Sequence, residues 1–455
     1  MPLDETRNYS PMTKEDIFDL VKDQNIRYIS LWFTDITGAV KSVVVPAAQL
    51  ESVINNGVPF DGSAIEGFAR VAESDMILLP DINTFTLLPW NNNDEERTAR
   101  IICGVHTPQG DPFNGDPRNA LIRALHAAAE MNLSFKTGME LEFFLFYTDA
   151  YGKPVLDAPQ DNAGYFDHAD EKAQVVRRKM VRALLDMGIN VNTAHSETGR
   201  GQHEIDFQYA HALVAADQLL TARVALRTIA HQNGLHCTFM PRPIANQPGS
   251  GMHTHQSLHD CDDDSNVFAD PAHEYHLSST ARHFLAGQLA HARGMSAVLA
   301  PIVNSYKRLG TSFEAPVYVT WAHINRGALI RVPSTAPGRE DHARLELRCP
   351  DPSANPYLAL AVMLMAGIDG IKQKLQLPDP LEETLLTRNR SRLRQVETLP
   401  SSLEEALDVM SRDDVVMNAL GPYISDRYMA AKRQEIDAYN QQITQWELDR
   451  YLSRY

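Results

Sequence analysis

Cysteine is scarce in this chain, and its spacing excludes two classes of small stabilised domain. The 455 residues include four cysteines, Cys103, Cys237, Cys261 and Cys349, and no two of them form a Cys-x-x-Cys pair. Disulfide scaffolds and structural zinc sites need more, or more closely spaced, cysteines, so we expect neither. Free thiols in a chain of this length indicate a reducing compartment.

Long hydrophobic runs and positive charge are also in short supply. The apolar run from Leu358 to Ile368 ends at Asp369 and is too short to cross a bilayer, so it predicts a buried helix. The N-terminal residues lack the apolar centre of a signal peptide. Acidic residues number 58 and basic residues 42, a net charge of −16. We therefore expect a cytoplasmic protein that binds neither nucleic acid nor membrane.

The common nucleotide and hydrolase motifs are missing too. The sequence has no GxxxxGK[ST] loop, no GxGxxG after a strand, no GxSxG and no HExxH. Phosphate groups would therefore have to be bound by metal ions, by arginines and by the Gly249-Ser250-Gly251 turn.

What the chain does contain is ordinary globular composition, with 44% hydrophobic and 22% charged residues. A helix is expected from Thr13, followed by a hairpin that turns at Thr37-Gly38 and by further short strands. The segment 107–118 is rich in Gly, Pro and Asp and marks a domain boundary. We expect a small α+β domain of about 90 residues ahead of a larger one. In the larger domain, helices are expected over 119–132, 170–187, 210–233, from Ser402 and near the C-terminus.

One pattern recurs on four strand-like segments of the larger domain: two polar side chains two positions apart. The pairs are Glu140 and Glu142, Glu204 and Asp206, His253 and His255, and Glu346 and Arg348, with Glu197 ahead of a Gly-rich turn. Alternate residues of a strand share one face, so these polar faces are expected to line a cavity. One such strand alone would be an ordinary half-exposed strand. Converging carboxylates repel one another, and a divalent cation such as Mg²⁺ or Mn²⁺ removes that problem.

Basic residues concentrate in a second part of the same domain. They are Lys307, Arg308, Arg326, Arg331, Arg344 and Arg348. One interpretation is a solvated basic face; the other is a set of guanidinium groups that bind phosphate and carboxylate oxygens. Together with carboxylate-bound metals, the second interpretation favours phosphoryl transfer. From these residues alone a two-metal hydrolase is the other candidate, although the arginines argue against it.

These motifs also occur together in one known family. The chain resembles the bacterial glutamine synthetases over nearly its whole length. The matching runs are FDGSAIEGFARVAESDMILLPD, GMELEFFLF, GQHEIDF, FMPRPIANQPGSGMHTHQS, NSYKRL, FEAPVYVTWAHINRGALIRVPS and LELRCPDPSANPYLALAVMLMAGIDGI. The resemblance implies an α+β fold: a β-grasp-like N-terminal domain over residues 1–114, and a catalytic domain over 115–455 with a curved antiparallel sheet and surrounding helices.

The resemblance also implies roles for individual residues. One metal ion would be held by Glu142, Glu197 and Glu204, and a second by Glu140, His253 and Glu346, with two or three Mg²⁺ or Mn²⁺ ions in all. Glutamate and the phosphates would be bound by Gly249, Arg308, Arg326, Arg331 and Arg348. ATP would be bound by His255, Ser257, Arg331 and Arg344. Ammonium would be bound by Asp61, Tyr165 and Glu197, beneath a flap that carries Glu314.

By the same resemblance, the expected reaction is the ATP-dependent ligation of ammonia to the glutamate γ-carboxylate. It proceeds through γ-glutamyl phosphate and yields glutamine, ADP and phosphate. The implied assembly is a dodecamer of two hexameric rings, in which Asp61 of one subunit completes the active site of its neighbour. Arg70 and the ending WELDRYLSRY resemble the shorter branch of the family, which is feedback-regulated and not adenylylated.

The sequence departs from the family pattern at the amine and glutamate ends of the site. Ala64 replaces the second Ser of DGSS, Pro248 replaces a common Asn, and the flap reads RLGTSFEAP from Arg308 to Pro316. These departures favour an alternative, a γ-glutamyl ligase that uses an organic amine such as a polyamine, whereas Asp61 and Tyr165 count against it. A third alternative is a catalytically silent relative; the presence of all six metal ligands gives it no support.

Overall fold

The structure is a computed structural model of the chain. It describes residues 12–63, 65, 67, 75–91, 97–168, 170–310, 315–336, 338–382 and 396–455. Within these residues, no helix is long and apolar enough to cross a membrane. Two sheets organise the fold, one in the N-terminal part of the chain and one in the remainder.

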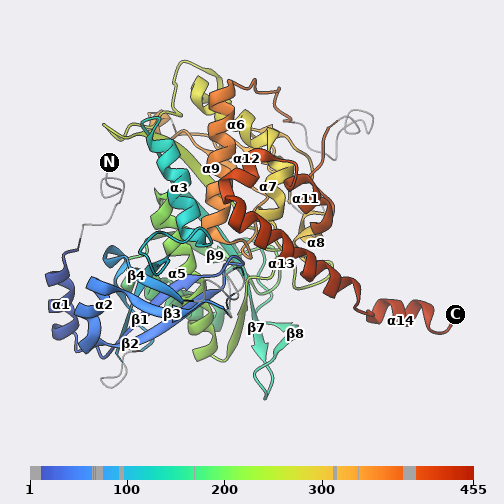
Figure 1. Ribbon diagram of the computed structural model, residues 1–455. Helices are drawn as coiled ribbons and strands as arrows, with labels where there is room; N and C mark the ends of the chain where they lie inside the picture. The colour runs from blue at the N-terminus through green and yellow to red at the C-terminus, as the bar shows by residue number, and fades with distance from the viewer. Residues whose placement is uncertain are drawn as a thin grey trace.

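The N-terminal part is built on a six-stranded sheet with the order β2-β1-β6-β4-β3 and with β5 beside β6 (Figure 1). Its strands are β1 (Tyr28–Thr34), β2 (Val40–Pro46), β3 (Val58–Asp61), β4 (Asp75–Pro80), β5 (Thr86–Leu87) and β6 (Thr98–His106). Strands β1 and β2 form the predicted antiparallel hairpin, and β1 pairs in parallel with β6. Helices α1 (Lys14–Asp23) and α2 (Leu50–Asn56) accompany the sheet, and Thr13 caps α1 as predicted.

The hairpin turn docks the N-terminal part against the rest of the chain. Gly38 has a φ of 83°, a value that favours glycine. A Cβ atom at this position would lie 2.9 Å from the Cα of Asn355, so only glycine allows the close approach. The Asn355 amide donates a hydrogen bond to the carbonyl of Asp35 at 3.1 Å and holds the turn in place.

The larger sheet has ten strands in the order β14-β15-β16-β13-β7-β10-β9, with β8, β11 and β12 also paired to β7. The strands are β7 (Leu133–Thr148), β8 (Pro154–Pro159), β9 (Val191–Ser196), β10 (Gln202–Phe207), β11 (Ala210–His211), β12 (Leu235–Thr238), β13 (Thr254–Asp260), β14 (Trp321–Ala322), β15 (Ile330–Arg331) and β16 (Leu345–Leu347). The named pairs are antiparallel except β14 with β15. Strand β7 runs through the sheet and pairs with five neighbours.

Helices pack on this sheet and bury its apolar face (Figure 1). They are α3 (Pro117–Ala129), α4 (Glu171–Asp186), α5 (Ala212–Gln232), α6 (Ser279–Ala290), α7 (Ala292–Leu299), α8 (Ser305–Leu309) and α9 (Pro356–Gln373). The predicted buried helix over Leu358 to Ile368 is confirmed, since it forms the centre of α9. Glycine lets α9 approach α6 closely, because a Cβ on Gly370 would lie 2.1 Å from the carbonyl of His283.

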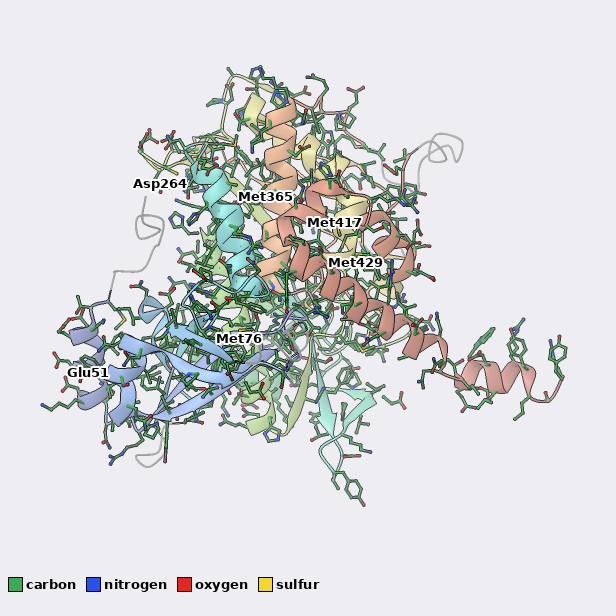
Figure 2. All side chains as sticks on the ribbon, in the orientation of Figure 1. Glu51, Met76, Asp264, Met365, Met417 and Met429 are labelled. Atoms are coloured by element: carbon green, nitrogen blue, oxygen red, sulfur yellow. The ribbon has the colours of Figure 1, made fainter. Side chains whose placement is uncertain are left out.

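Four helices follow α9 in the described part of the chain. They are α11 (Leu403–Met410), α12 (Asp414–Leu420), α13 (Pro422–Asn440) and α14 (Gln445–Tyr451). Ser402 caps α11, which begins where the sequence predicted. Met365 on α9, Met417 on α12 and Met429 on α13 pack against the main core (Figure 2). Helix α14 extends away from the body of the molecule (Figure 1). Short 3₁₀ turns cover Ala47–Gln49, Ile82–Thr84, Glu274–His276 and Glu340–His342.

Candidate active site

Strand register brings the recurring polar pairs together on one face of the larger sheet. Glu204 lies opposite Glu142, and Asp206 lies opposite Glu140, because β10 pairs with β7 in antiparallel register. On the other side of β7, His255 lies opposite Glu346 through the pairing of β13 with β16. The intervening residues Leu141, Ile205 and Leu345 are fully buried on the opposite face. Burial of the apolar face of each strand therefore determines that the polar side chains point to the opposite side of the sheet.

A cavity of about 530 Å³ opens over this polar face. It is lined by eleven of the residues expected from the sequence, namely Glu140, Glu142, Tyr165, Glu197, Glu204, Asp206, His253, Arg326, Arg331, Glu346 and Arg348. Phe166, Thr193, Ala194 and His195 also line it. Carboxylates, imidazoles and guanidinium groups thus share one enclosed space.

Two further cavities meet the first. A cavity of about 870 Å³ shares Glu140 and Asp206 with it and is also lined by His255, Ser257 and Arg344. A small cavity of about 140 Å³ shares Glu142 and Glu197 and is lined by Pro248, Gly249 and Arg308. The carboxylates thus lie where a large cavity and a small cavity join.

The small cavity is shaped by the glycine turn that the sequence singled out. A Cβ on Gly249 would lie 2.3 Å from the carbonyl of Pro241 and 3.0 Å from the Cγ of Arg308. Only glycine fits there, so the backbone itself forms the wall. Glu142 is held against this turn, because its carboxylate accepts hydrogen bonds from the Gly251 amide at 3.0 Å and from Gln202 at 2.8 Å.

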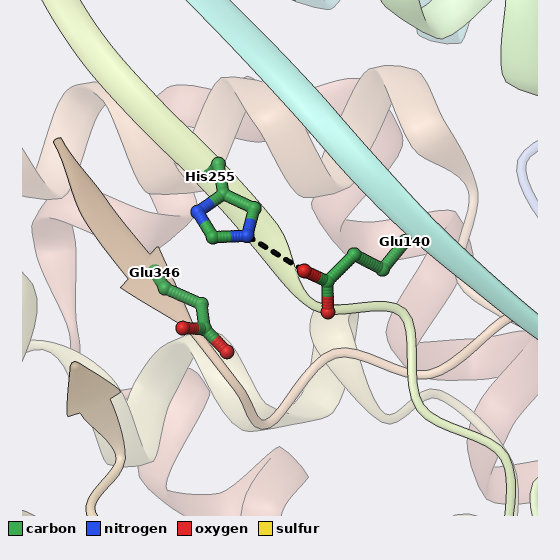
Figure 3. A group of neighbouring side chains, drawn as sticks. All are labelled: Glu140, His255 and Glu346. Atoms are coloured by element: carbon green, nitrogen blue, oxygen red, sulfur yellow. Dashed lines mark hydrogen bonds and ion pairs between the residues drawn. The ribbon is translucent and has the colours of Figure 1, made fainter. Parts of the chain in front are cut away.

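Among the residues that the structure describes, three groups of side chains are close enough to share a metal ion. Within each group one ligand atom per residue lies within 4.8 Å of the others: Glu140, His255 and Glu346 (Figure 3); His195, Glu197 and Glu204; and Glu140, Glu204 and Asp206. Two of these groups differ from the expected sets by one residue: His255 stands in place of His253, and His195 stands in place of Glu142, which belongs to none of the three groups. The third group, Glu140, Glu204 and Asp206, was not expected as a set. His253 still lies near the group of Glu140, His255 and Glu346, with its Nδ1 2.9 Å from Glu140 and 3.8 Å from Glu346.

The charges in this cluster are unbalanced in a way that fits a bound cation. Burial, and then the charge of Glu197, raises the pKa of Glu142 to about 8. Burial and the charge of Glu142 likewise raise the pKa of Glu204. Burial would also raise the pKa of Glu140, but hydrogen bonds to His253 and His255 outweigh it and lower that pKa. Buried carboxylates with one or two imidazoles are the donors that Mg²⁺ or Mn²⁺ prefers, so the residues fit such an ion.

Arginines border the carboxylates on the side of β15 and β16. The carboxylate of Glu346, which is 1% exposed, accepts one hydrogen bond from Arg331 Nε and one from Arg348 Nη1, each at 2.5 Å. Arg348 therefore lowers the pKa of Glu346, although burial opposes that effect. Arg308 is buried beneath the small cavity and donates to the main-chain carbonyls of residues 348, 349 and 350. These contacts favour the ligand-binding interpretation over a solvated basic face.

Some predicted residues lie elsewhere. Lys307 does not line these cavities, since its Nζ lies 5.3 Å from the ring centroid of Tyr439. Asp61 is exposed at the end of β3 of the N-terminal sheet, lines none of the three cavities, and accepts a hydrogen bond from the Ser63 amide at 2.8 Å. Glu314, with the flap segment 311–314, and Ala64 and Arg70 lie outside the described residues.

Sequence reasoning missed four residues of the cavity wall, Phe166, Thr193, Ala194 and His195. His195 lies two positions before Glu197, and its Nε2 is 3.9 Å from Glu204, so the alternating spacing already used for the other pairs could have found it. Phe166 packs edge-on against the His195 ring at 4.5 Å. Phe166 has a φ of 59°, a backbone conformation that a bulky residue rarely adopts and that the sequence does not reveal.

Fold and site together define an enzyme of the carboxylate–amine ligase class, with a β-grasp domain ahead of a curved sheet that gathers acidic and basic side chains. The family model described as the glutamine synthetase β-grasp domain matches residues 25–108, and the model for the glutamine synthetase catalytic domain matches residues 114–451. The chain belongs to the glutamine synthetase family. It is a ligase of that family, in which glutamine is formed from glutamate and ammonia with ATP.

Relatives of known name agree with this assignment. The chain is 47% identical to a glutamine synthetase of Thermus thermophilus, over 97% of this chain and 99% of the relative. It is 44% identical to a glutamine synthetase of Clostridium saccharobutylicum over the same shares of each chain. Among solved structures, a GmaS/ADP complex superimposes with a TM-score of 0.85 at 31% identity, over 96% of this chain and 99% of that one. GmaS without ligand gives a TM-score of 0.84 at 32% identity, again over 96% of this chain and 99% of that one.

Proposed function

We propose that the chain forms glutamine in two steps at the junction of its three cavities. The glutamate γ-carboxylate first takes the γ-phosphoryl group of ATP, giving γ-glutamyl phosphate and ADP, and ammonia then displaces phosphate. The observation that carries the proposal is the convergence of the cavities on Glu140, Glu142 and Glu204. The sizes of the cavities suit one large and two small reactants, which would meet at these carboxylates.

Two or three Mg²⁺ or Mn²⁺ ions are the proposed cofactors. One ion would be held by Glu142, Glu197 and Glu204 and a second by Glu140, His253 and Glu346, all of which line the 530 Å³ cavity. His195 and His255 would be the neighbouring imidazoles. When bound, the ions neutralise negative charge on the transferred phosphoryl group. The raised pKa values of Glu142 and Glu204 support this assignment, since a cation would stabilise both carboxylates in their charged form.

ATP is assigned to the 870 Å³ cavity, with His255, Ser257 and Arg344 in its wall, and Arg331 lines the adjoining 530 Å³ cavity. The similarity to GmaS, solved in complex with ADP, supports nucleotide binding. Arg344 Nε lies 3.3 Å from His255 Nδ1, which orients the imidazole toward Glu140. The nucleotide would thus lie with its phosphates toward the carboxylate cluster.

Glutamate is assigned to the small cavity and the adjoining arginines. Gly249 presents its backbone there, and Arg308 lies beside it. Arg326 and Arg348 line the neighbouring cavity, where their guanidinium groups would bind the glutamate carboxylate and the phosphoryl oxygens. As charge develops during transfer, Arg326 is placed to stabilise it without rearrangement of solvent.

The amine end of the site is proposed to be shared between subunits. Tyr165 and Glu197 line the cavity in one subunit. Asp61, from the β-grasp domain over residues 1–114, would supply a negative charge to the catalytic domain over 115–455 of a neighbouring subunit. Glu314 would close the site and exclude water from the acyl phosphate. A cytoplasmic dodecamer of two hexameric rings, of the branch that is not adenylylated, follows from the same proposal.

Relative activity with different amines tests the proposed function. With saturating glutamate and ATP, we expect kcat/KM for ammonium to exceed the values for methylamine, ethylamine and putrescine, because an anionic pocket of small volume selects a small cation. Hydroxylamine is expected to react poorly. ADP release without added amine serves as the control. If any organic amine exceeds ammonium, the γ-glutamylamide ligase takes the place of this proposal.

A further inference from the structure

A short loop carries Arg326 into the catalytic cavity. Residues 323–329 connect β14 to β15, two strands that pair in parallel. Arg326 lines the cavity and hydrogen-bonds to Tyr165. Within the loop, Ile324 is 77% exposed, so side-chain burial contributes little to fixing the backbone at that point. Ala328 and Leu329 are buried and fix the end of the loop, so its start, ahead of Arg326, depends on hydrogen bonds.

The carboxylate of Glu382 contacts the start of this loop directly. One carboxylate oxygen accepts the amide hydrogen of His323 at 2.6 Å, and the other accepts the amide hydrogen of Ile324 at 2.9 Å. Each oxygen thus fixes one of two successive peptide groups. Hydrogen bonds to a charged acceptor are stronger than those between neutral groups. Arg326 follows Ile324 by two residues.

Residues 378–382 run alongside β14 and place Glu382. The Trp321 indole donates to the carbonyl of Pro378 at 2.7 Å, and the Leu381 amide donates to the carbonyl of Trp321 at 2.8 Å. The Asn325 side chain donates to the carbonyl of Leu381 at 3.1 Å. The backbone next to Glu382 is therefore fixed by hydrogen bonds, and the Glu382 side chain adds two more to the loop just before Arg326.

We propose that Glu382 is a positioning residue for Arg326: its carboxylate fixes the peptide groups that set the direction of the loop, and so holds the guanidinium at the reacting phosphoryl group. This inference rests on the proposed role of Arg326. Glu382 itself does not line the 530 Å³ cavity and acts only through the loop. Misplacing a catalytic group by about 1 Å can cost about 100-fold in rate.

Kinetics of Glu382 variants in the full-length enzyme test the inference. Glu382→Ala is expected to lower kcat for glutamine formation by about 10–100-fold, with a smaller change in the KM for ATP. Glu382→Gln keeps one acceptor oxygen, so its kcat should lie between that of the wild type and that of Glu382→Ala. In an Arg326→Ala background, Glu382→Ala should change kcat/KM less than about twofold, because residues that act as a unit are not additive.

Asp149 provides a matched control. Its carboxylate also accepts two backbone amide hydrogens, from Tyr151 at 2.8 Å and Lys153 at 2.9 Å, in the turn between β7 and β8. Asp149→Ala removes the same kind of contact and should leave kcat/KM unchanged. Hydrogen exchange gives a readout independent of the reaction: residues 323–329 should exchange faster in Glu382→Ala and at the wild-type rate in Asp149→Ala.

Two results would overturn the inference. One is wild-type kcat and unchanged exchange of residues 323–329 in Glu382→Ala. The other is an equal loss of kcat/KM with and without Arg326, which would make the effect merely structural. If the wild-type chain forms no glutamine at all, the proposed function fails, and the exchange of residues 323–329 still decides whether Glu382 holds the loop.

Discussion

His291 joins three helices through two carboxylates, and this contact predicts a pH-dependent stability. Its Nδ1 lies 2.9 Å from Asp413, which caps α12, and its Nε2 lies 3.2 Å from Asp369 on α9. A neutral imidazole has one N–H, so both hydrogen bonds require the protonated ring. Burial would lower the pKa of His291, but the hydrogen bond and charge of Asp413, then those of Asp369, outweigh it and raise that pKa.

The expected magnitude follows from these two charge-assisted hydrogen bonds. Such bonds contribute about 1.5–3 kcal/mol each when buried, and the three side chains keep 12–24% exposure, so we expect about 1.5–3 kcal/mol for the pair. Because the folded pKa lies above the unfolded value of about 6.5, the contribution is complete below about pH 6.5. It declines as the pH rises through the folded pKa, when the ring loses its proton.

Urea unfolding of wild type and His291→Gln at several pH values measures this contribution. The difference in unfolding free energy should be largest near pH 6 and should shrink toward pH 9. His283→Gln is the control, because His283 Nδ1 contacts only the carbonyl of Leu375, at 2.8 Å, and the neutral ring can supply that hydrogen bond. A difference for His291→Gln that stays constant or grows with pH would refute the reasoning.

The remaining predictions concern the catalytic site. Glu204→Gln should lower ligase activity more than about 100-fold and remove one Mn²⁺ from the calorimetric stoichiometry. The metal-free variant should unfold at a higher temperature, because the neutral amide avoids the unfavourable burial and repulsion that raise the pKa of Glu204. Unchanged Mn²⁺ binding would contradict the ligand assignment. Mixed oligomers of inactive Asp61→Ala and inactive Glu142→Ala subunits should recover activity, and no recovery in well-mixed oligomers would exclude a shared site. Ala64→Ser adds a hydrogen bond of about 0.5–1.5 kcal/mol and should lower the KM for ammonium by up to about tenfold; an unchanged KM would show that position 64 does not contact the amine.

Strand periodicity explains how much of the site the sequence could reveal. The spacing of Glu140 and Glu142, and of Glu204 and Asp206, was enough to predict that each pair shares a face, because alternate residues of a strand point the same way. The spacing within a strand carries no information on register between strands. Only the pairing of β13 with β16 places His255 opposite Glu346 and brings it into a group that the sequence had assigned to His253.

Contacts through the backbone were beyond sequence reasoning. Lys307 and Arg308 are adjacent in sequence, yet they project in different directions from α8, and only Arg308 reaches the site. Glu382 accepts hydrogen bonds from main-chain amides nearly sixty residues away. Any residue other than proline can donate such a bond, so the sequence does not reveal it. The buried apolar helix α9, by contrast, was evident from composition alone.

Isotope transfer from glutamate to phosphate tests the central claim most directly. If the γ-carboxylate is phosphorylated before ammonia attacks, one of its oxygens leaves with the phosphate. Glutamate labelled with ¹⁸O in the γ-carboxylate is incubated with the wild-type enzyme, ATP, Mg²⁺ and ammonium, and the product phosphate is analysed by mass spectrometry. The account predicts one ¹⁸O atom in the phosphate for each glutamine formed; glutamine formation with unlabelled phosphate would contradict it.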